Sequence, residues 1–152
     1  MVAPEQDKPI ILEGGNIHTG TGDVISGDIA FRDGKITAVG SLDALSGIAH
    51  YERIDVSGKE IYPGLIFVNT TLGLVEIGGV DVTVDNSEYG QINPGAQSAV
   101  AYNTDSHVIP VVRSNGILLA QVVPTGGSLS GTSSVMQLDA WNWEDAIYKT
   151  GR

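Results

Sequence analysis

Short runs of β-prone residues, each closed by a turn signal, fill residues 9–64 of the chain. Residues 28–32 and 35–39 alternate apolar and polar side chains, and Asp33 and Gly34 separate them. An Asp-Gly pair between two such runs predicts a β-hairpin with a type I′ turn, because that turn needs positive φ at both central residues.

Three further runs in this half predict strands. Residues 9–13, 53–56 and 60–62 are rich in β-prone residues, and each is followed by Gly, Ser-Gly or Pro-Gly, which are typical of turns. Residues 42–49 predict a short helical or irregular connection. Together these runs predict a small β-sandwich of about five or six strands over residues 9–64.

The pattern changes after position 64. Residues 65–68 form an unbroken apolar run that ends at the polar Asn69. A short continuous apolar run is typical of a strand buried on both faces, as in a parallel sheet. Residues 117–123 form a second, mostly apolar run, so we expect two buried strands in this half.

Helices are expected between and after these two strands. Residues 104–106 are N-cap candidates for a helix that continues to Arg113. Asn142, followed three residues later by Asp145, resembles a capping box and predicts a second helix over residues 143–149. The order strand, helix, strand, helix predicts the start of an α/β unit.

Composition narrows the classes of function. The net charge is −10 and the eight Lys and Arg residues are scattered, which argues against partners with anionic surfaces, both nucleic acids and membranes. The chain has no Cys, which excludes disulfides, thiolate metal sites and a Cys nucleophile. No apolar stretch reaches the roughly 18 residues of a membrane helix, and no signal peptide precedes the first strand. We therefore expect a soluble protein, cytoplasmic, or periplasmic if a signal peptide has been removed.

Two motifs carry a resemblance to a known family. Residues 29–40 read IAFRDGKITAVG, and residues 54–66 read IDVSGKEIYPGLI. In this order they resemble the start of the amidohydrolase superfamily, near its imidazolonepropionase-like and dipeptidase-like members. The resemblance implies a mixed β and α/β fold: a flexible lead-in over residues 1–8, a composite β-sandwich over 9–64, and about two strands of an incomplete metal-dependent-hydrolase (β/α)8 barrel over 65–152.

The chain departs from the family at the metal site. In the family, the first barrel strand ends in His-x-His, and the corresponding positions here are Asn69 and Thr71. Strand alternation predicts that both side chains share one face. An amide and a hydroxyl are poor zinc ligands, which leaves three interpretations. The two side chains orient water or substrate in a site whose metal ligands lie on later strands, or they line a binding pocket without metal. In the third interpretation they only form hydrogen bonds with backbone groups at the strand end.

Three other residues are candidates for positioning substrate or water. Glu76 follows the first barrel-type strand closely, and Thr125 and Ser130 lie in a Gly/Ser/Thr loop after the second. Loops at the carboxyl-terminal ends of barrel strands carry the active site, and successive N–H groups of such a loop can bind an anion. The alternative for Glu76 is an exposed loop carboxylate, and for the loop a purely structural role. His18, His50 and His107 are not spaced as ligand pairs and are expected to be surface or loop residues.

The resemblance implies a hydrolase of amides, cyclic amides or dipeptide-like substrates that uses metal-activated water. The family's later ligands are not in this sequence, so we expect the chain to be an N-terminal part that is inactive alone. A divalent metal, zinc first, is expected only in a chain that carries those ligands. The alternatives are a non-catalytic binding or assembly module, one chain of a split or nicked enzyme, and a truncated gene product. The expected partners are a small-molecule substrate and either the remaining barrel portion or further copies of the chain.

Overall fold

The computed structural model describes residues 2–3, 6–41 and 50–151. The chain divides into two compact units, and each is described by itself. The N-terminal unit comprises Pro4–Pro63, and the C-terminal unit comprises Gly64–Arg152 together with Met1–Ala3. The connection expected over residues 42–49 lies outside the described residues.

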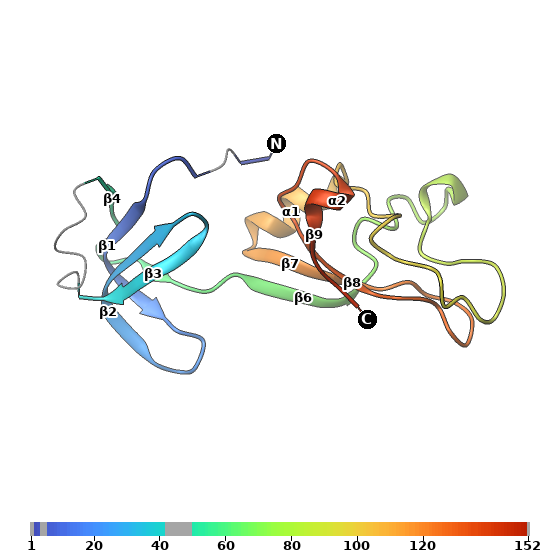
Figure 1. Cartoon of the computed structure of the whole chain (residues 1–152), viewed down its shortest axis with the longest axis horizontal. Helices are drawn as coiled ribbons and strands as arrows, with labels where there is room; N and C mark the ends of the chain where they lie inside the picture. Colours follow the sequence, from blue (N-terminus) through green and yellow to red (C-terminus); the bar gives the residue numbers. More distant parts are fainter. Residues whose placement is uncertain (1, 4–5, 42–49, 152) are drawn as a thin grey trace. The chain divides into compact units, whose positions relative to one another are not determined.

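The N-terminal unit is built on one mixed sheet of five strands, with β1 at its centre (Figure 1). The strands are β1 (Ile10–His18), β2 (Val24–Arg32), β3 (Lys35–Gly40), β4 (Glu52–Asp55) and β5 (Glu60–Ile61). The order is β3-β2-β1-β4, and β5 also pairs with β1. The described strands therefore form a single hydrogen-bonded sheet, whereas the sequence pattern predicted two facing sheets.

Two glycine-containing positions set the shape of this sheet. Asp33 and Gly34 have φ values of 51° and 68°, so the predicted type I′ turn between β2 and β3 is confirmed. Gly14, with φ of 76°, lies at a bulge in β1. The bulge divides β1 into a first half that pairs with β4 and a second half that pairs with β5, both in parallel.

The C-terminal unit contains a four-stranded sheet in the order β6-β7-β8-β9. These strands are β6 (Leu65–Thr70), β7 (Ile117–Val122), β8 (Ser134–Gln137) and β9 (Ile147–Thr150). β6 and β7 are parallel, as expected for a βα unit, but β8 and β9 then add antiparallel. The expected alternation of strand and helix is therefore wrong after β7, because the chain returns directly as a strand.

The helices of this unit are short: η2 (Asp81–Thr83), α1 (Val108–Ser114) and α2 (Trp143–Ala146). α1 matches the later part of the helix predicted over 104–113, and Pro110 fits in its first turn, where no N–H partner is needed. Asn142 accepts a hydrogen bond from the Asp145 N–H (2.8 Å), which confirms the predicted cap. α2 nevertheless ends at Ala146, because the residues that follow pair with β8 as β9.

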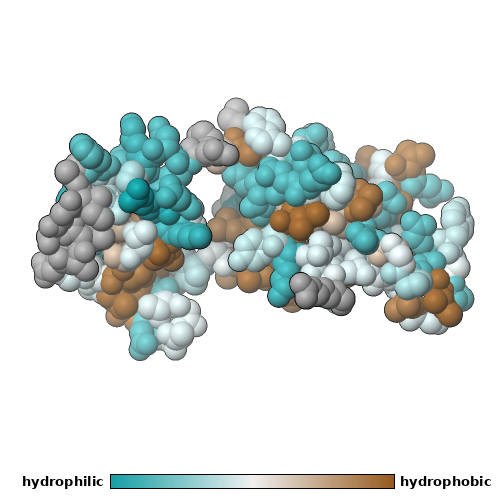
Figure 2. All heavy atoms as spheres, in the orientation of Figure 1, coloured by the Kyte–Doolittle hydropathy of each residue, from teal (hydrophilic) through white to brown (hydrophobic). Residues whose placement is uncertain are grey.

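The core of the C-terminal unit lies under β7 and β8, and it leaves β6 uncovered. Ala120, Val122 and Met136 are fully buried. Leu65, Ile66, Phe67 and Val68 are instead 44–60% exposed, so the prediction that this run is buried on both faces is wrong for the described chain. β6 is the edge strand of this sheet, and residues 65–69 are exposed. Apolar side chains, brown in Figure 2, accordingly reach the surface.

Candidate functional site

Two long loops follow the carboxyl-terminal ends of the parallel strands β6 and β7. We call residues 71–107 and 123–133 together the loop platform. Isolated β-bridges join the two loops at Ser87 with Thr125, Ile92 with Leu129, and Gln97 with Thr132. The loops therefore lie side by side at the same end of the sheet, which is the end where parallel α/β folds carry their ligand sites.

Main-chain hydrogen bonds hold the platform together. The Thr125 N–H donates to the Asn86 carbonyl (2.6 Å), and the Ser98 N–H donates to the Thr132 carbonyl (3.1 Å). The buried Ser98 hydroxyl also donates to the Val122 carbonyl at the end of β7 (2.9 Å). The loops are thus ordered by pairing with each other and with the sheet, without regular secondary structure beyond η2.

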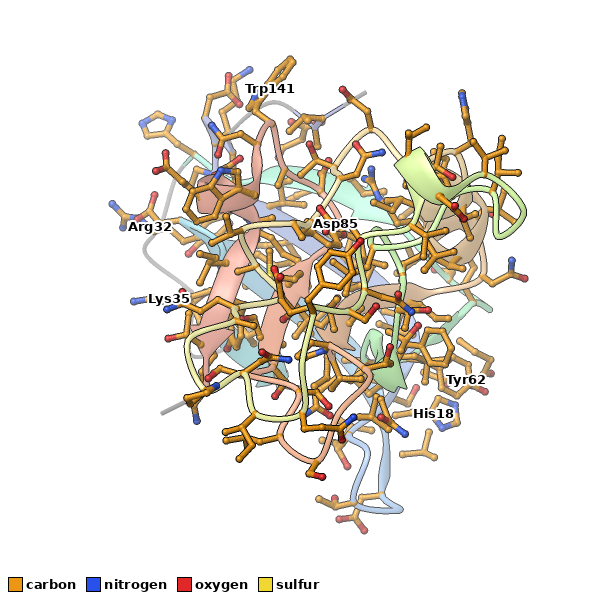
Figure 3. All side chains as sticks on the ribbon, turned by 90° about the vertical axis from the view of Figure 1, so that its right-hand side faces the viewer. His18, Arg32, Lys35, Tyr62, Asp85 and Trp141 are labelled. Atoms are coloured by element: carbon orange, nitrogen blue, oxygen red, sulfur yellow. The ribbon has the colours of Figure 1, made fainter. Side chains whose placement is uncertain are left out.

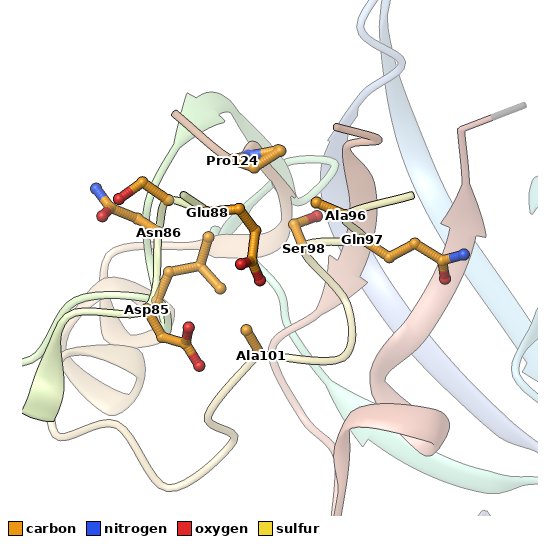
Figure 4. Close-up of a pocket in the computed structure, with 10 residues that line it drawn as sticks. Asp85, Asn86, Glu88, Ala96, Gln97, Ser98, Ala101 and Pro124 are labelled. Carbon is orange, nitrogen blue, oxygen red and sulfur yellow. The ribbon is translucent and has the colours of Figure 1, made fainter. Parts of the chain in front are cut away.

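A small cavity of about 40 Å³ lies within the platform (Figure 4). Its lining combines carboxylates, amides, serines and small apolar groups: Leu74, Asp85, Asn86, Ser87, Glu88, Ala96, Gln97, Ser98, Ala101 and Pro124. Such a volume holds about one water molecule. A substrate bound here would therefore lie mostly on the open surface of the described residues.

The platform carries charge of one sign. Its acidic residues are Glu76, Asp81, Asp85, Glu88 and Asp105. Neither loop contains Lys or Arg. Carboxylates without nearby cations give a negative potential, which disfavours the approach of anionic ligands and favours neutral or cationic ones.

Asn69 and Thr71 do not have the regular strand geometry that a His-x-His pair requires. Asn69 has a left-handed backbone, with φ of 54°, and is exposed. The pairing of β6 with β7 shifts register between Phe67 and Thr70, and Thr71 lies beyond the end of β6. The alternation on which the expectation of a shared face rested is therefore interrupted here, and the shared face stays a prediction.

Glu76 is half-buried and anchored by two side chains from the segment before α1. Asn103 donates its amide N–H to one carboxylate oxygen of Glu76 (3.2 Å), and the Ser106 hydroxyl donates to the other (2.9 Å). Ser106 is only 3% exposed. Glu76 is thus a buttress between two parts of the same loop, which corrects the alternative of a free surface carboxylate.

Tyr102 lies beside this cluster. The residue is 5% exposed, and its hydroxyl is buried without a hydrogen-bond partner. Burial, and secondarily the negative charge of Glu76, raise the pKa of the Tyr102 hydroxyl to about 12. Gly73, with φ of 76°, packs so closely on the Tyr102 ring that a Cβ at position 73 would lie 2.5 Å from a ring carbon.

Thr125 and Ser130 both use their hydroxyls within the platform. Thr125 donates to the Asn86 carbonyl (3.2 Å), and Ser130 donates to the Gly126 carbonyl. Both are therefore bonded to main-chain carbonyls of the platform and shape its loops. Their role in positioning substrate stays a prediction.

The residues that the structure describes do not fit a divalent metal. No three His, Asp or Glu side chains among them converge as a metal site would require. In the N-terminal unit, His18 pairs with Glu60 (Nε2 to Oε2, 2.6 Å) and stacks on Tyr62 with 4.1 Å between ring centroids (Figure 3). His107 precedes α1 as its N-cap residue and is exposed.

Sequence reasoning missed the residues that organise the platform. Asn103, Ser106 and Tyr102 lie in a segment that was interpreted only as a loop and a helix start, and Asp85 and Glu88 lie in an aperiodic stretch. The density of Asn, Ser and Asp around position 104 was a signal for side-chain to main-chain bonding, but it does not specify Glu76 as a partner.

Comparison with known proteins bears on the fold. No protein-family model matches the sequence, and no curated protein matches it. A solved structure, that of an amidohydrolase from Thermotoga maritima, superposes with a TM-score of 0.81 over 92% of this chain at 23% sequence identity. The chain therefore shares the fold of part of that Thermotoga protein. The match spans 36% of the Thermotoga chain, so this chain corresponds to about a third of the length of that protein. Within the described residues, no helix is long and apolar enough to cross a membrane.

Proposed function

We propose that the chain forms part of an amidohydrolase-type enzyme that hydrolyses C–N bonds in amides, cyclic amides or dipeptide-like substrates. The superposition on the Thermotoga amidohydrolase carries this proposal. The loop platform supports it, because it lies at the carboxyl-terminal ends of β6 and β7, where barrel enzymes hold their catalytic groups.

In this proposal, the residues of the loop platform shape the site and orient substrate or water. Asn69 and Thr71 replace the family's first pair of metal ligands with an amide and a hydroxyl, which bind substrate or water by hydrogen bonds. Asp85 and Glu88 line the platform cavity, and because neither platform loop contains Lys or Arg they favour neutral or amine-bearing substrates over anionic ones. The groups that activate water would come from polypeptide outside the described residues.

The uncovered strand β6 supports a partner for this chain. Consecutive strand residues point to opposite faces, so the exposure of Leu65 through Val68 means that the described part of the C-terminal unit covers neither face of β6 fully, and it leaves one edge unpaired. A second copy that paired edge to edge would extend the sheet but leave both faces bare. Further βα units would add a strand and cover the faces, so the proposed partner is the remaining barrel portion, on the same or another polypeptide.

One observation favours a second function, that of a non-catalytic binding or assembly module. The described residues do not assemble a metal site, while β6 offers a continuous apolar edge. In this case the platform would bind a ligand and β6 would join a larger assembly.

The deciding experiment isolates the protein from its own cells by a tag on this chain and measures its native mass and its activity. The substrates are neutral dipeptides, N-acyl amines and cyclic amides, with Zn²⁺ or Mn²⁺ added. Hydrolysis by material that contains further barrel polypeptide supports the enzyme. A ligand-binding species without hydrolysis supports the module. Hydrolysis by the 152-residue chain alone would contradict the need for further polypeptide.

A further inference from the structure

A groove in the C-terminal unit borders the loop platform, because platform residues 104–106 form part of its lining. One wall is the segment that leads into and forms α1, with Thr104, Ile109 and Arg113, and the other is the segment after β8, with Leu138, Asp139 and Trp141. The Leu138 N–H bonds to the Leu118 carbonyl at the start of β7, whereas the platform follows the end of β7. The segment after β8 therefore lies at the other end of the strand from the proposed hydrolase site.

The start of the chain occupies this groove. Val2 is half-buried and lines it, and the Ala3 N–H donates to both carboxylate oxygens of Asp139, at 3.2 Å each. Val2 and Ala3 accordingly belong to the C-terminal unit.

Asp139 is well placed to bind a main-chain N–H. Its Oδ1 also pairs with the Arg113 guanidinium (3.2 Å), and both side chains are about one-third exposed, at 32% and 30%. The arginine fixes the carboxylate, and a hydrogen bond to an ionised acceptor is stronger than a neutral one. Because the donor is a backbone group, this contact recognises an extended peptide rather than one particular side chain.

The size of the groove favours a peptide over a small molecule. About 160 Å³ remains beside Val2, walled by Ile109, Pro110 and Leu138, with Trp141 at the rim. Small-molecule sites usually measure about 300–1,000 Å³. The remaining space instead suits a single side chain. Trp141 is 75% exposed and projects from the surface (Figure 3), so one side of the groove is open.

We propose that this groove is a docking site for an extended peptide segment and that residues 2–3 of the same chain are its occupant. The strap, as we call residues 2–3, is held by the Ala3–Asp139 contact and by packing of Val2. It closes the groove by an intramolecular contact that is independent of the proposed hydrolase activity.

The test compares Ala3→Pro, which removes the N–H donor, with Ala3→Gly, which keeps it. In the parent chain, NMR should show the Ala3 amide exchanging about tenfold more slowly than in a free peptide of residues 1–8, as expected for a hydrogen bond to a charged group. Ala3→Pro should shift the resonances of Ile109, Asp139 and Trp141, and Ala3→Gly should leave them nearly unchanged. Asp139→Ala, which removes the acceptor oxygens, should abolish the slow exchange of Ala3.

Three results would overturn the proposal. Exchange at the free-peptide rate in the parent chain would mean that the strap is not docked. Groove resonances that do not respond to Ala3→Pro would mean that it docks elsewhere. Shifts that depend on protein concentration would mean that the strap comes from a second copy, against the intramolecular assignment. Recovery of the parent shifts when the peptide of residues 1–8 is added to Ala3→Pro would show directly that the groove accepts a peptide.

Discussion

The Ser106 hydroxyl donates a 2.9 Å hydrogen bond to Glu76 and thereby ties the start of the loop after β6 to the segment that enters α1. The two residues are 30 positions apart in the chain. Ser106 is almost fully buried, so its hydroxyl could not bind water in place of Glu76 without opening of the loop. This contact joins residues near the two ends of the first platform loop.

Ser106→Ala should lower the free energy of unfolding by about 1–3 kcal/mol, because it leaves one oxygen of a half-buried carboxylate without its donor. Urea titration followed by Trp fluorescence measures the change. Ser87→Ala, at an exposed position of the same platform, is the control and should stay within about 0.5 kcal/mol of the parent. Equal effects of the two variants would contradict the buttress role of Glu76.

Gly73→Ala should be strongly destabilising, by more than about 2 kcal/mol. The backbone there has φ of 76°, and the added Cβ would meet the ring of the buried Tyr102 at 2.5 Å. Gly78→Ala, in the same loop and with no atom within 4 Å of its Cβ, provides the matched control and should be neutral or slightly stabilising. Thermal unfolding compares the two, and a neutral Gly73→Ala would disprove the close packing.

The N-terminal unit should lose stability in acid through Glu60. Hydrogen bonds from Asn16 and then His18 hold the pKa of Glu60 below its ordinary value of 4.5. A carboxylate with a lowered folded-state pKa stabilises the fold above that ordinary value, and the contribution is lost as the pH falls through the folded-state pKa. NMR titration should place the Glu60 midpoint below 4.5, and Asn16→Ala should move it upward. A midpoint at or above 4.5 in the parent would contradict the contact.

Ile66→Lys should reduce self-association of the isolated chain. Ile66 is 57% exposed on an edge strand, and lysine on an exposed edge is a common natural protection against strand pairing. Val82→Lys alters an apolar residue that is 93% exposed outside the sheet, and it should leave association unchanged. Sedimentation velocity over a range of concentrations measures both variants. A similar decrease for the two would indicate a general effect of charge and not one of the β6 edge.

Restoring the family's histidines should not restore a metal site. The backbone of Asn69 is left-handed, and Thr71 lies beyond β6. The double variant Asn69→His/Thr71→His should therefore gain less than about tenfold in Zn²⁺ affinity over either single variant. A preorganised chelating pair would gain about a hundredfold or more. Competition with a fluorescent zinc indicator measures the affinities. A hundredfold gain would show that the two positions do face a common point.

Local chemistry decided which parts of the fold could be predicted. The turn at Asp33 and Gly34 and the cap at Asn142 depend on residues within a few positions of each other, and both are confirmed. Burial of residues 65–68 depends on what packs against them, so the apolar run established a strand but not its cover. Strands β8 and β9, of four residues each, were too short for periodicity to reveal.

The candidate site was less accessible to sequence reasoning than the fold. The parallel order of β6 and β7 indicated where the loops gather, and Glu76, Thr125 and Ser130 do lie on the platform. The bridge between Ser87 and Thr125 joins two aperiodic segments through backbone groups. Because nearly every residue has these groups, no sequence pattern predicts the bridge.

The same main-chain pairing has an evolutionary consequence. Because the platform loops are joined through N–H and carbonyl groups, exposed side chains such as Ser87, Ile92 and Gln97 can be exchanged without breaking the bridges beneath them. New recognition chemistry can therefore arise on this surface by single substitutions. The main chain maintains the conformation of the platform loops, whereas the exposed side chains determine which ligand binds. Ligand specificity can therefore change during evolution while the loop conformation is retained.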